Sequence, residues 1–319
     1  MNTDEHGSEI KTNLFLIRVH PCSSVAKFIG IASMKIAVLG ANGQLGRDLC
    51  PRLAGEVVPL TRAEIDLDRP ETIAAYLSAN RPDVVINCAA YNFVDKAEDD
   101  PDAAFRVNAW GVRALARACR DANSRLVHVS TDYVFGLDET RTTPFREDDP
   151  PGPVSVYGLS KLSGEYVVRS TCPAHLVIRT CGLYGVWGSG GKGGNFVETM
   201  LRVAGQGKPL KVVNDQRCTP TYTADLAVAI ADLVARSAQG LYHVTSAGDC
   251  TWYELAAEIF RQAGVAANLT PTTSAQFGAP ARRPGYSVLA CDKLATAGVT
   301  KPRPWQDALA AYLKERAAR

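Results

Sequence analysis

The feature that most constrains the fold is a group of three glycines between a strand pattern and a helix pattern. Residues 36–39 form a short apolar run with β-branched members, which is typical of a buried strand. Gly40, Gly43 and Gly46 follow this run, and residues 45–53 have a helical pattern. Glycines at such a turn allow a tight bend, a close approach of the backbone to a pyrophosphate and close packing of the helix on the strand. The spacing therefore predicts a dinucleotide-binding βα turn, and the alternative is a set of ordinary turn glycines.

Composition narrows the classes of protein to which the chain can belong. Its 35 basic and 33 acidic residues leave a net charge of only +2, which argues against a nucleic-acid or membrane-surface binder. No apolar run approaches the roughly 20 residues that cross a bilayer. The nine cysteines lack a C-x-x-C pair and the five histidines lie far apart, so we expect reduced thiols and no metal site. These features favour a cytoplasmic protein with no nucleic-acid or membrane partner, and they leave a homodimer open.

Residues 1–33 precede the first strand and do not join its pattern. The first ten residues carry acidic rather than basic charge, so they make a poor signal peptide. We expect residues 1–33 to form a poorly ordered N-terminal extension without a catalytic part. Met34, directly before the strand, is a candidate start of translation.

Strand and helix patterns alternate after the glycine turn. This alternation predicts a parallel sheet with right-handed crossovers. The regular alternation ends after the strand at 176–179. The other strands are expected at 57–60, 82–87, 125–129 and 240–245, and the helices at 70–80, 102–123, 154–165, 196–204, 222–235, 252–263 and 306–319.

The end of the second strand bears on the choice of cofactor. An acidic residue there would bind the ribose 2′-hydroxyl, whereas an arginine can accommodate a 2′-phosphate. The strand at 57–60 ends at Thr61 and Arg62, without an acid. We therefore expect NADPH and keep NADH open, since Arg62 could also be a solvated surface residue.

A tyrosine and a lysine four residues apart are the candidate catalytic groups. Tyr157 and Lys161 share one face of the helix at 154–165, and Ser155 is its expected N-cap. A ketone that accepts hydride must be protonated, and a phenol of pKa about 10 is a reluctant donor. A neighbouring ammonium stabilises the phenolate and so tunes proton transfer. Thr131, at the end of the preceding strand, would polarise the carbonyl.

Two further points belong to this predicted site. Asn108, among apolar neighbours on the helix at 102–123, could anchor a water or backbone relay behind Lys161. The alternative for the whole motif is an amphipathic surface helix whose tyrosine packs and whose lysine is solvated. The glycine-rich turn before it favours the catalytic interpretation.

These residues resemble the extended short-chain dehydrogenase/reductase superfamily, and within it the dTDP-4-dehydrorhamnose reductase family. The resemblance runs from Met34 nearly to the C-terminus. It is carried by GANGQLG, CAAYNFVDKAEDDP, STDYVF, VYGLSKLSGE, GKGGNFVETMLR, VNDQ followed by TPT, LYHVTSAG and ARRPGYS.

The resemblance implies an α/β fold with a Rossmann-type doubly wound parallel sheet and a smaller C-terminal substrate-binding region. Residues 34–180 would form the NAD(P)-binding domain. Residues 181–319 would mainly bind the nucleotide-sugar, with some segments returning to the first domain. The implied reaction is the NADPH-dependent reduction of the C4 ketone of dTDP-4-dehydrorhamnose to dTDP-L-rhamnose, a precursor of cell-surface polysaccharide.

Individual roles are transferred onto matching positions of this chain. Tyr157, Lys161, Thr131 and Asn108 would be catalytic. Thr131, Asp132, Asn195, Arg282 and Arg283 would bind the sugar nucleotide, because arginine forks suit a pyrophosphate. The residues expected to line the cofactor are Gly40, Gly43, Gln44, Leu45, Gly46, Arg62, Asp66, Leu67, Ala89, Ala90, Tyr91, Asn92, Val129, Tyr157 and Lys161.

Two alternatives to this function stay open. The family usually has a tryptophan where this chain has Gly182, so a different 4-keto-6-deoxy sugar nucleotide is an alternative substrate. A non-catalytic NADP-binding regulatory subunit is the other alternative, although such proteins tend to lose the tyrosine or lysine that this chain keeps. The chain lacks a matching set of acidic residues for the magnesium site of some relatives, so we expect no metal.

Overall fold

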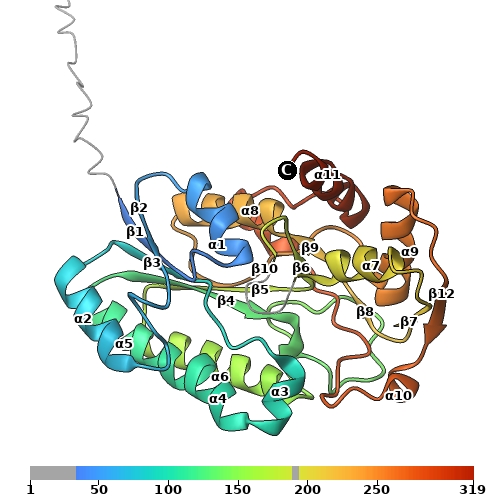
Figure 1. The fold of residues 1–319 in the computed structure, drawn as a ribbon. Coiled ribbons are helices and arrows are strands. Elements are labelled where there is room, and N and C mark those ends of the chain that lie inside the picture. Colours follow the sequence, from blue (N-terminus) through green and yellow to red (C-terminus); the bar gives the residue numbers. More distant parts are fainter. Residues whose placement is uncertain (1–33, 189–193) are drawn as a thin grey trace, which may run out of the picture. The chain divides into compact units, whose positions relative to one another are not determined.

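A six-stranded parallel sheet is the centre of the computed structural model, which describes residues 34–188 and 194–319 (Figure 1). The expectation for residues 1–33 lies outside the described residues. The strand order is β10-β5-β4-β3-β1-β2, and every neighbouring pair is parallel. The predicted doubly wound α/β class is therefore confirmed. The strands are β1 (Lys35–Leu39), β2 (Glu56–Leu60), β3 (Val84–Asn87), β4 (Arg125–Thr131), β5 (His175–Thr180) and β10 (Gly240–His243).

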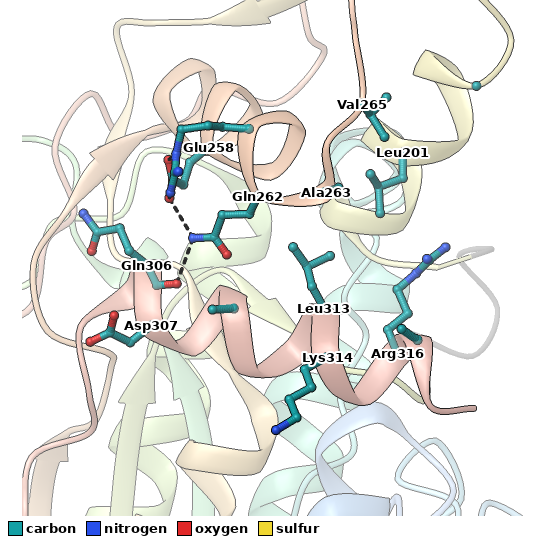
Figure 2. A pocket seen from close by; sticks show the side chains of 14 residues that line it. Leu201, Glu258, Gln262, Ala263, Val265, Gln306, Asp307, Leu313, Lys314 and Arg316 are labelled. Carbon is teal, nitrogen blue, oxygen red and sulfur yellow. Dashed lines mark hydrogen bonds and ion pairs between the residues drawn. The ribbon is translucent and has the colours of Figure 1, made fainter.

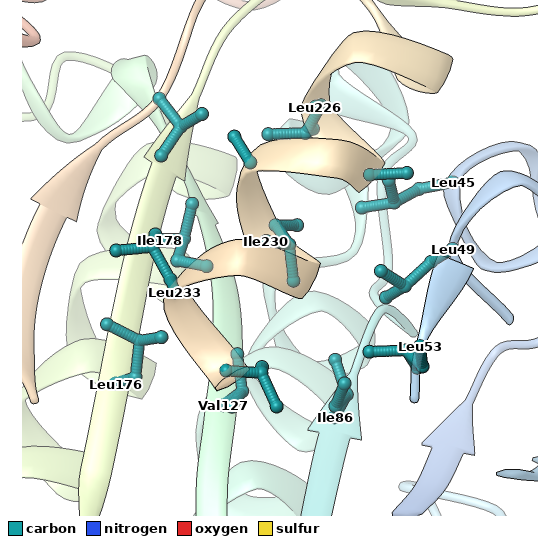
Figure 3. Packing of buried hydrophobic residues seen from close by; sticks show 14 of the residues in the cluster. Leu45, Leu49, Leu53, Ile86, Val127, Leu176, Ile178, Leu226, Ile230 and Leu233 are labelled. Carbon is teal, nitrogen blue, oxygen red and sulfur yellow. The ribbon is translucent and has the colours of Figure 1, made fainter. Parts of the chain in front are cut away.

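Helices cover both faces of this sheet. One face carries α1 (Gln44–Leu49) and α8 (Thr223–Ala235), and the other carries α2 (Pro70–Asn80), α5 (Val112–Asp121) and α6 (Val156–Thr171) (Figure 1). Burial on both faces explains why the strands are continuous apolar runs. Each fully buried leucine or isoleucine contributes roughly 1.5–3 kcal/mol. Figure 3 shows this packing for Leu45, Leu49 and Leu53, for Leu226, Ile230 and Leu233 of α8, and for Ile86, Val127, Leu176 and Ile178 of the sheet.

The strand order reverses between β1 and β3. The chain goes from β1 outward to β2 and then returns past β1 to β3. In open α/β sheets, ligands bind at the carboxyl ends of the strands where the order reverses in this way. Gly40 ends β1 with a φ of +72°, and a Cβ there would lie 3.0 Å from the backbone nitrogen of Ala89 beyond β3. The predicted glycine turn and the segment after β3 therefore meet at this point.

The chain after β5 builds a second apolar core. It joins α7 (Phe196–Ala204), α9 (Trp252–Ala263) and α11 (Trp305–Ala317) with β7 (Leu210–Val213), which pairs in parallel with β12 (Leu269–Thr272). By contrast, α8 and β10 belong to the layers of the main sheet. The small elements are α3 (Val94–Asp99), α4 (Pro101–Phe105), α10 (Ser274–Phe277), β6 (Leu183–Tyr184), β8 (Arg217–Cys218), β9 (Thr221–Tyr222) and β11 (Cys250–Thr251).

A groove of about 860 Å³ lies between α7, α9 and α11 (Figure 2). Acidic, basic and apolar side chains line it, among them Glu258, Asp307 and Lys314. It contains none of the predicted site residues. Size alone therefore does not identify the active site.

Three helix predictions need correction. The helix expected at 154–165 is α6, which begins at Val156 and continues to Thr171. The helix expected at 45–53 ends at Leu49, and Pro51 lies in a 3₁₀ turn because it cannot donate the next helical hydrogen bond. The helix expected at 102–123 is instead α4, a π-helical segment at Arg106–Gly111, and α5. Gly111 packs there against the backbone of Leu67 without room for a Cβ. Periodicity alone does not reveal such a wide turn, whereas the helices expected at 70–80, 196–204 and 252–263 have the observed bounds.

Within the described residues, no helix combines the length and apolarity needed to cross a membrane. All eight cysteines of this part of the chain are free thiols. No three histidine, cysteine, aspartate or glutamate side chains gather there in an arrangement suited to a metal ion.

Candidate active site

The glycine turn has the close backbone approach that a dinucleotide site needs. Gly46 is buried at the start of α1, and a Cβ there would lie 2.7 Å from the Cα of Ala41. Any side chain at this position would push the helix off the turn. The first backbone N–H groups of α1 have no partner within the helix and can bind an anion. Gly40, Gly43 and Gly46 thus allow the turn to lie directly against the start of α1.

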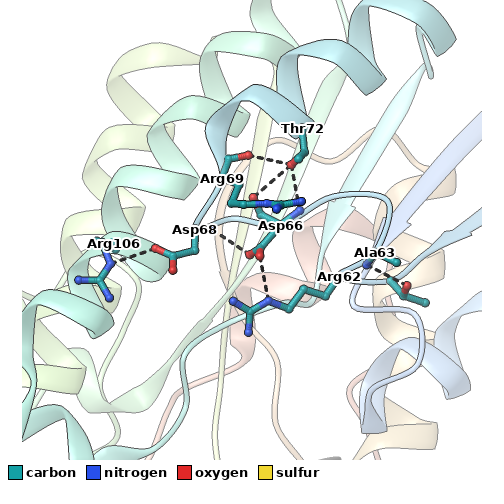
Figure 4. Close-up of polar contacts among 8 residues, drawn as sticks. Arg62, Ala63, Asp66, Asp68, Arg69, Thr72 and Arg106 are labelled. Atoms are coloured by element: carbon teal, nitrogen blue, oxygen red, sulfur yellow. Dashed lines mark hydrogen bonds and ion pairs between the residues drawn. The ribbon is translucent and has the colours of Figure 1, made fainter.

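Arg62 lies in the loop directly after β2. Its Nε donates to Asp66 at 3.0 Å, and its side chain is 76% exposed (Figure 4). The other oxygen of Asp66 accepts from the backbone nitrogen of Asp68 at 3.0 Å, which orders the loop. The contact with Asp66 leaves the two terminal nitrogens of the Arg62 guanidinium outside that bond.

Thr131, Tyr157 and Lys161 meet at the carboxyl end of β4. The ammonium of Lys161 donates to the carbonyl oxygen of Val129 at 2.7 Å. The hydroxyl of Thr131 lies close enough to the phenol of Tyr157 to lower its pKa. The ring of Tyr133 packs edge-on against that of Tyr157, with centroids 5.8 Å apart. A strand end and the first turns of α6 therefore bring together a hydroxyl, a phenol and an ammonium.

The local sequence explains how α6 presents these groups. Ser155 is the N-cap and accepts from the backbone nitrogen of Gly158 at 3.2 Å, as predicted. The cap starts the helix at Val156, so Tyr157 lies in the first turn and Lys161 one turn later. Both side chains consequently point to the same strand end.

Burial dominates the acid–base properties of this pair. Desolvation lowers the pKa of Lys161 to about 8, although Glu165 and Cys88 act in the opposite direction. Desolvation also raises the pKa of Tyr157 to about 12, with the Thr131 hydrogen bond lowering it and Asp132 raising it. The expected lowering of the Tyr157 pKa is therefore not met, because burial raises it. The phenol remains protonated at neutral pH, as a proton donor must.

Asn108 lies behind the pair, on the π-helical segment. Its amide oxygen accepts from the backbone nitrogen of Tyr91, and its amide nitrogen donates to the Tyr91 carbonyl, both at 2.9 Å. The same nitrogen donates to the hydroxyl of Ser160 at 3.0 Å. Asn108 thus ties the segment after β3 to α6 at the residue before Lys161.

Asp132 points into the protein. Its carboxylate accepts hydrogen bonds from Thr131 at 3.1 Å, Cys181 at 3.0 Å and Ser287 at 2.6 Å. Burial raises its pKa, while these three donors lower it. Asp132 therefore holds the strand end in place as well as lying next to Thr131.

The two predicted arginines occupy different surroundings. Arg283 pairs with Asp95 at 2.9 Å and lies near Tyr133, whose ring packs against that of Tyr157. Arg282 is 58% exposed and pairs with Glu139. Contacts thus connect Arg283, and not Arg282, to the Tyr157 cluster.

Asn195 connects the second core with the glycine turn. It is the N-cap of α7, where its oxygen accepts from Glu198 at 3.1 Å. Its amide nitrogen donates to the carbonyl of Gly185 at 2.9 Å and to the side chain of Gln44 at 3.3 Å.

Comparisons with known proteins agree with this geometry. Residues 34–318 match the family described as RmlD substrate binding domain. The chain belongs to this family. Among RmlD-family relatives, dTDP-4-dehydrorhamnose reductase of Mycolicibacterium smegmatis is 39% identical, over 88% of this chain and 85% of the relative. A probable dTDP-4,6-dihydroxy-2-methyloxan-3-one 4-ketoreductase of Streptomyces antibioticus is 42% identical, over 86% of this chain and 93% of the relative.

A solved structure also resembles this RmlD-family chain. The dTDP-4-dehydrorhamnose reductase of Bacillus anthracis, crystallised in complex with NADP, superposes with a TM-score of 0.83. It is 36% identical, and the match covers 89% of this chain and 99% of the solved chain.

Sequence reasoning missed several residues around the RmlD-family site. Tyr133 was available in the STDYVF motif, directly after the two predicted residues Thr131 and Asp132. Glu165 lies four residues after Lys161 on the same face of α6, which is a local signal. Its partner Arg179 comes from β5 and has no local signal that links it to the site.

Proposed function

We propose that this protein reduces the C4 ketone of dTDP-4-dehydrorhamnose to dTDP-L-rhamnose with NADPH. The observation that carries the proposal is the meeting of Thr131, Tyr157 and Lys161 at the strand end beside the glycine turn. Relatives named dTDP-4-dehydrorhamnose reductase, and one solved with NADP, support it. The family and the balanced charge fit a cytoplasmic enzyme that makes a sugar nucleotide for cell-surface polysaccharide.

The cofactor would lie over the carboxyl end of the sheet. The glycine turn and the first turn of α1 would hold its pyrophosphate, and Arg62, Asp66 and Leu67 its adenosine end. When bound, the reduced nicotinamide supplies hydride. Its ring would lie near the segment after β3 and near Val129. The residues in these roles are Gly40, Gly43, Gln44, Leu45, Gly46, Ala89, Ala90, Tyr91, Asn92 and Val129.

Three side chains would act on the ketone. The Thr131 hydroxyl polarises the carbonyl, and Tyr157 donates a proton to its oxygen. The Lys161 ammonium binds the ribose and supplies positive charge beside the phenol. Asn108 holds these three side chains in place through its hydrogen bonds to the Tyr91 backbone and to Ser160.

The chain after residue 180 would form most of the sugar-nucleotide side. Arg283 is well placed for the diphosphate, since Tyr133 joins it to Tyr157 and a guanidinium binds phosphate oxygens in pairs. Arg282 is more exposed and would bind the sugar nucleotide at the rim of the site. Asp132 and Asn195 would order the walls of the site through their own hydrogen bonds.

One incubation tests the proposal. Purified protein should oxidise NADPH when dTDP-4-dehydrorhamnose is present and not when it is omitted, and NMR of the product should identify dTDP-L-rhamnose. Absence of NADPH oxidation with this ketosugar would contradict the proposal. Oxidation accompanied by a different product would favour another ketosugar.

A different 4-keto-6-deoxy sugar nucleotide is the second candidate, and Gly182 favours it. This residue follows Cys181, which binds Asp132, and has a φ of +55°. A Cβ there would lie 3.1 Å from the Cα of Pro220 and 3.6 Å from the ring of Trp252. The chain therefore has no side chain at the position where the family usually has a tryptophan. Relatives named for other dTDP-ketosugars are about as similar as the rhamnose enzymes. The non-catalytic subunit is less well supported, because the predicted catalytic groups are in contact.

The reduction rate should fall as pH rises through about 8. Lys161 is charged below its pKa of about 8 and neutral above it, so the ammonium is lost on the alkaline side. The measurement is kcat/KM for the ketosugar as a function of pH. Lys161→Arg provides the comparison, because a guanidinium stays charged and should remove this alkaline decline. An identical decline in both proteins would assign it to another group.

Arg62→Ala should weaken the use of NADPH by about tenfold or more, because a charge-assisted hydrogen bond to phosphate is lost. The KM for NADH should change little, since NADH has no 2′-phosphate. Initial rates with each cofactor measure the effect. Arg120→Ala is the matched control, because Arg120 is also exposed and paired with an aspartate, on α5. Equal losses with NADPH and NADH would contradict the role given to Arg62.

A further inference from the structure

A buried charged cluster lies directly behind Lys161 and has no part in the mechanism above. Glu165 on α6 and Arg179 on β5 are both fully buried. Arg179 donates to the two oxygens of Glu165, with Nε at 2.9 Å from one and Nη2 at 2.7 Å from the other. Burying two charges is costly unless their geometry and hydrogen bonds compensate. Apolar side chains could replace an ion pair whose only role was to join α6 to β5. The position of this pair next to Lys161 therefore points to a second role.

The cluster is linked to the catalytic strand end by one hydroxyl. Ser130 donates to Glu165 at 2.5 Å. Ser130 lies between Val129, whose carbonyl binds Lys161, and Thr131, whose hydroxyl lies close to Tyr157. Glu165 therefore contacts the strand at the one residue that separates the two catalytic contacts.

The charge of Glu165 acts on Lys161. Lys161 lies one helical turn before Glu165, and this carboxylate is the largest of the influences that keep the pKa of Lys161 from falling further. The other titratable groups that face Lys161 are Cys88, beyond β3, and His128 on β4. Burial keeps His128 neutral and raises the pKa of the Cys88 thiol to about 12, so neither carries charge at neutral pH. Glu165 is thus the charged group that favours the ammonium.

The far side of the cluster fixes Arg179. Its Nη1 lies 3.4 Å from Nε2 of His243 on β10, and the ring of Phe135 lies 5.0 Å from the guanidinium carbon. Burial lowers the pKa of His243 to about 3, so this histidine is neutral and can accept a hydrogen bond from the guanidinium of Arg179. His243 in turn contacts Glu147 through its backbone nitrogen at 2.9 Å. Arg179 cannot move away from Glu165 without breaking these contacts.

We infer that Glu165 is a positioning residue for the reaction: fixed by Arg179 and Ser130, it keeps Lys161 charged and in register with Val129 and Thr131. The inference rests on the proposed function, because it assumes that the Lys161 ammonium serves the reduction. The residues that this inference adds run from β4 to β10, and none of them has a direct role on cofactor or substrate in the proposed function.

Glu165→Gln tests the electrostatic half of this inference. Glutamine keeps the volume and can still accept from Ser130, but it removes the negative charge. The alkaline decline of kcat/KM should therefore move down by about one pH unit, with turnover at lower pH less affected. Glu147→Gln is the matched control: it removes a charge at the far end of the same chain of contacts and should leave the decline in place. A Glu165→Gln enzyme that loses activity equally at all pH values would show a merely structural role and overturn the inference.

Ser130→Ala tests the register and remains informative if Glu165→Gln folds poorly. Glu165 keeps its charge through Arg179, so the alkaline decline should stay at the wild-type pH. The kcat should fall by about two- to tenfold, the value of one lost hydrogen bond. An unchanged kcat would contradict the positioning role of this contact.

NADPH affinity, followed by fluorescence across pH, gives a readout without ketosugar. Its alkaline weakening should shift in Glu165→Gln as kcat/KM does. Wild-type protein that binds NADPH but ignores the ketosugar would contradict the proposed function alone. An unshifted affinity profile in the variant would contradict this inference alone.

Discussion

Tyr157→Phe should lower kcat for ketosugar reduction by about 10²- to 10⁴-fold, the usual contribution of a positioned general acid. The substitution removes only the hydroxyl, which lies close to Thr131. The ring remains, and so does its edge contact with Tyr133. NADPH affinity should therefore change little, and the loss should appear in kcat rather than in KM.

Steady-state rates with NADPH and dTDP-4-dehydrorhamnose, together with fluorescence titration of NADPH, measure this prediction. Tyr166→Phe is the matched control, since Tyr166 also lies on α6 but its side chain is exposed. It should leave both quantities at wild-type values. Turnover by Tyr157→Phe within a few-fold of the control would refute the assignment of Tyr157 as proton donor.

Arg179→Met should lower the free energy of unfolding by about 3–5 kcal/mol, because it leaves the carboxylate of Glu165 buried without its partner. Denaturant unfolding monitored by circular dichroism measures the loss. Arg282→Met breaks an exposed ion pair instead and should cost less than about 1 kcal/mol.

The double variant Glu165→Leu, Arg179→Met removes both charges. It should recover much of the stability lost in Arg179→Met, since no unpaired charge remains. It should not recover activity, if Glu165 positions Lys161. A small loss in Arg179→Met, equal to that of Arg282→Met, would contradict the account of this buried pair.

Local patterns were sufficient for much of the fold. The three glycines predicted the tight turn after β1, where Gly40 has a φ of +72°. The start of α6 followed from Ser155, whose side chain caps the helix as expected. The four-residue spacing of Tyr157 and Lys161 then placed both at the end of β4.

Features that depend on distant segments were not predictable in this way. Glu165 and Arg179 form an ion pair only after α6 packs on the sheet over β4 and β5, and no local sequence signal links the two residues. The inward direction of Asp132 depends on Cys181 and Ser287, which come from later parts of the chain. The raised pKa of Tyr157 likewise reflects tertiary burial.

The π-helical segment at Arg106–Gly111 has a consequence for how this region tolerates changes in length. A π turn contains one residue more than the α-helical turn it replaces, so deleting one residue there would let the stretch relax into a continuous α-helix. Each residue turns an α-helix by about 100°, and the deletion would rotate the amide of Asn108 away from Tyr91 relative to α5. Removing one residue would thus break the tie that Asn108 makes between the segment after β3 and α6.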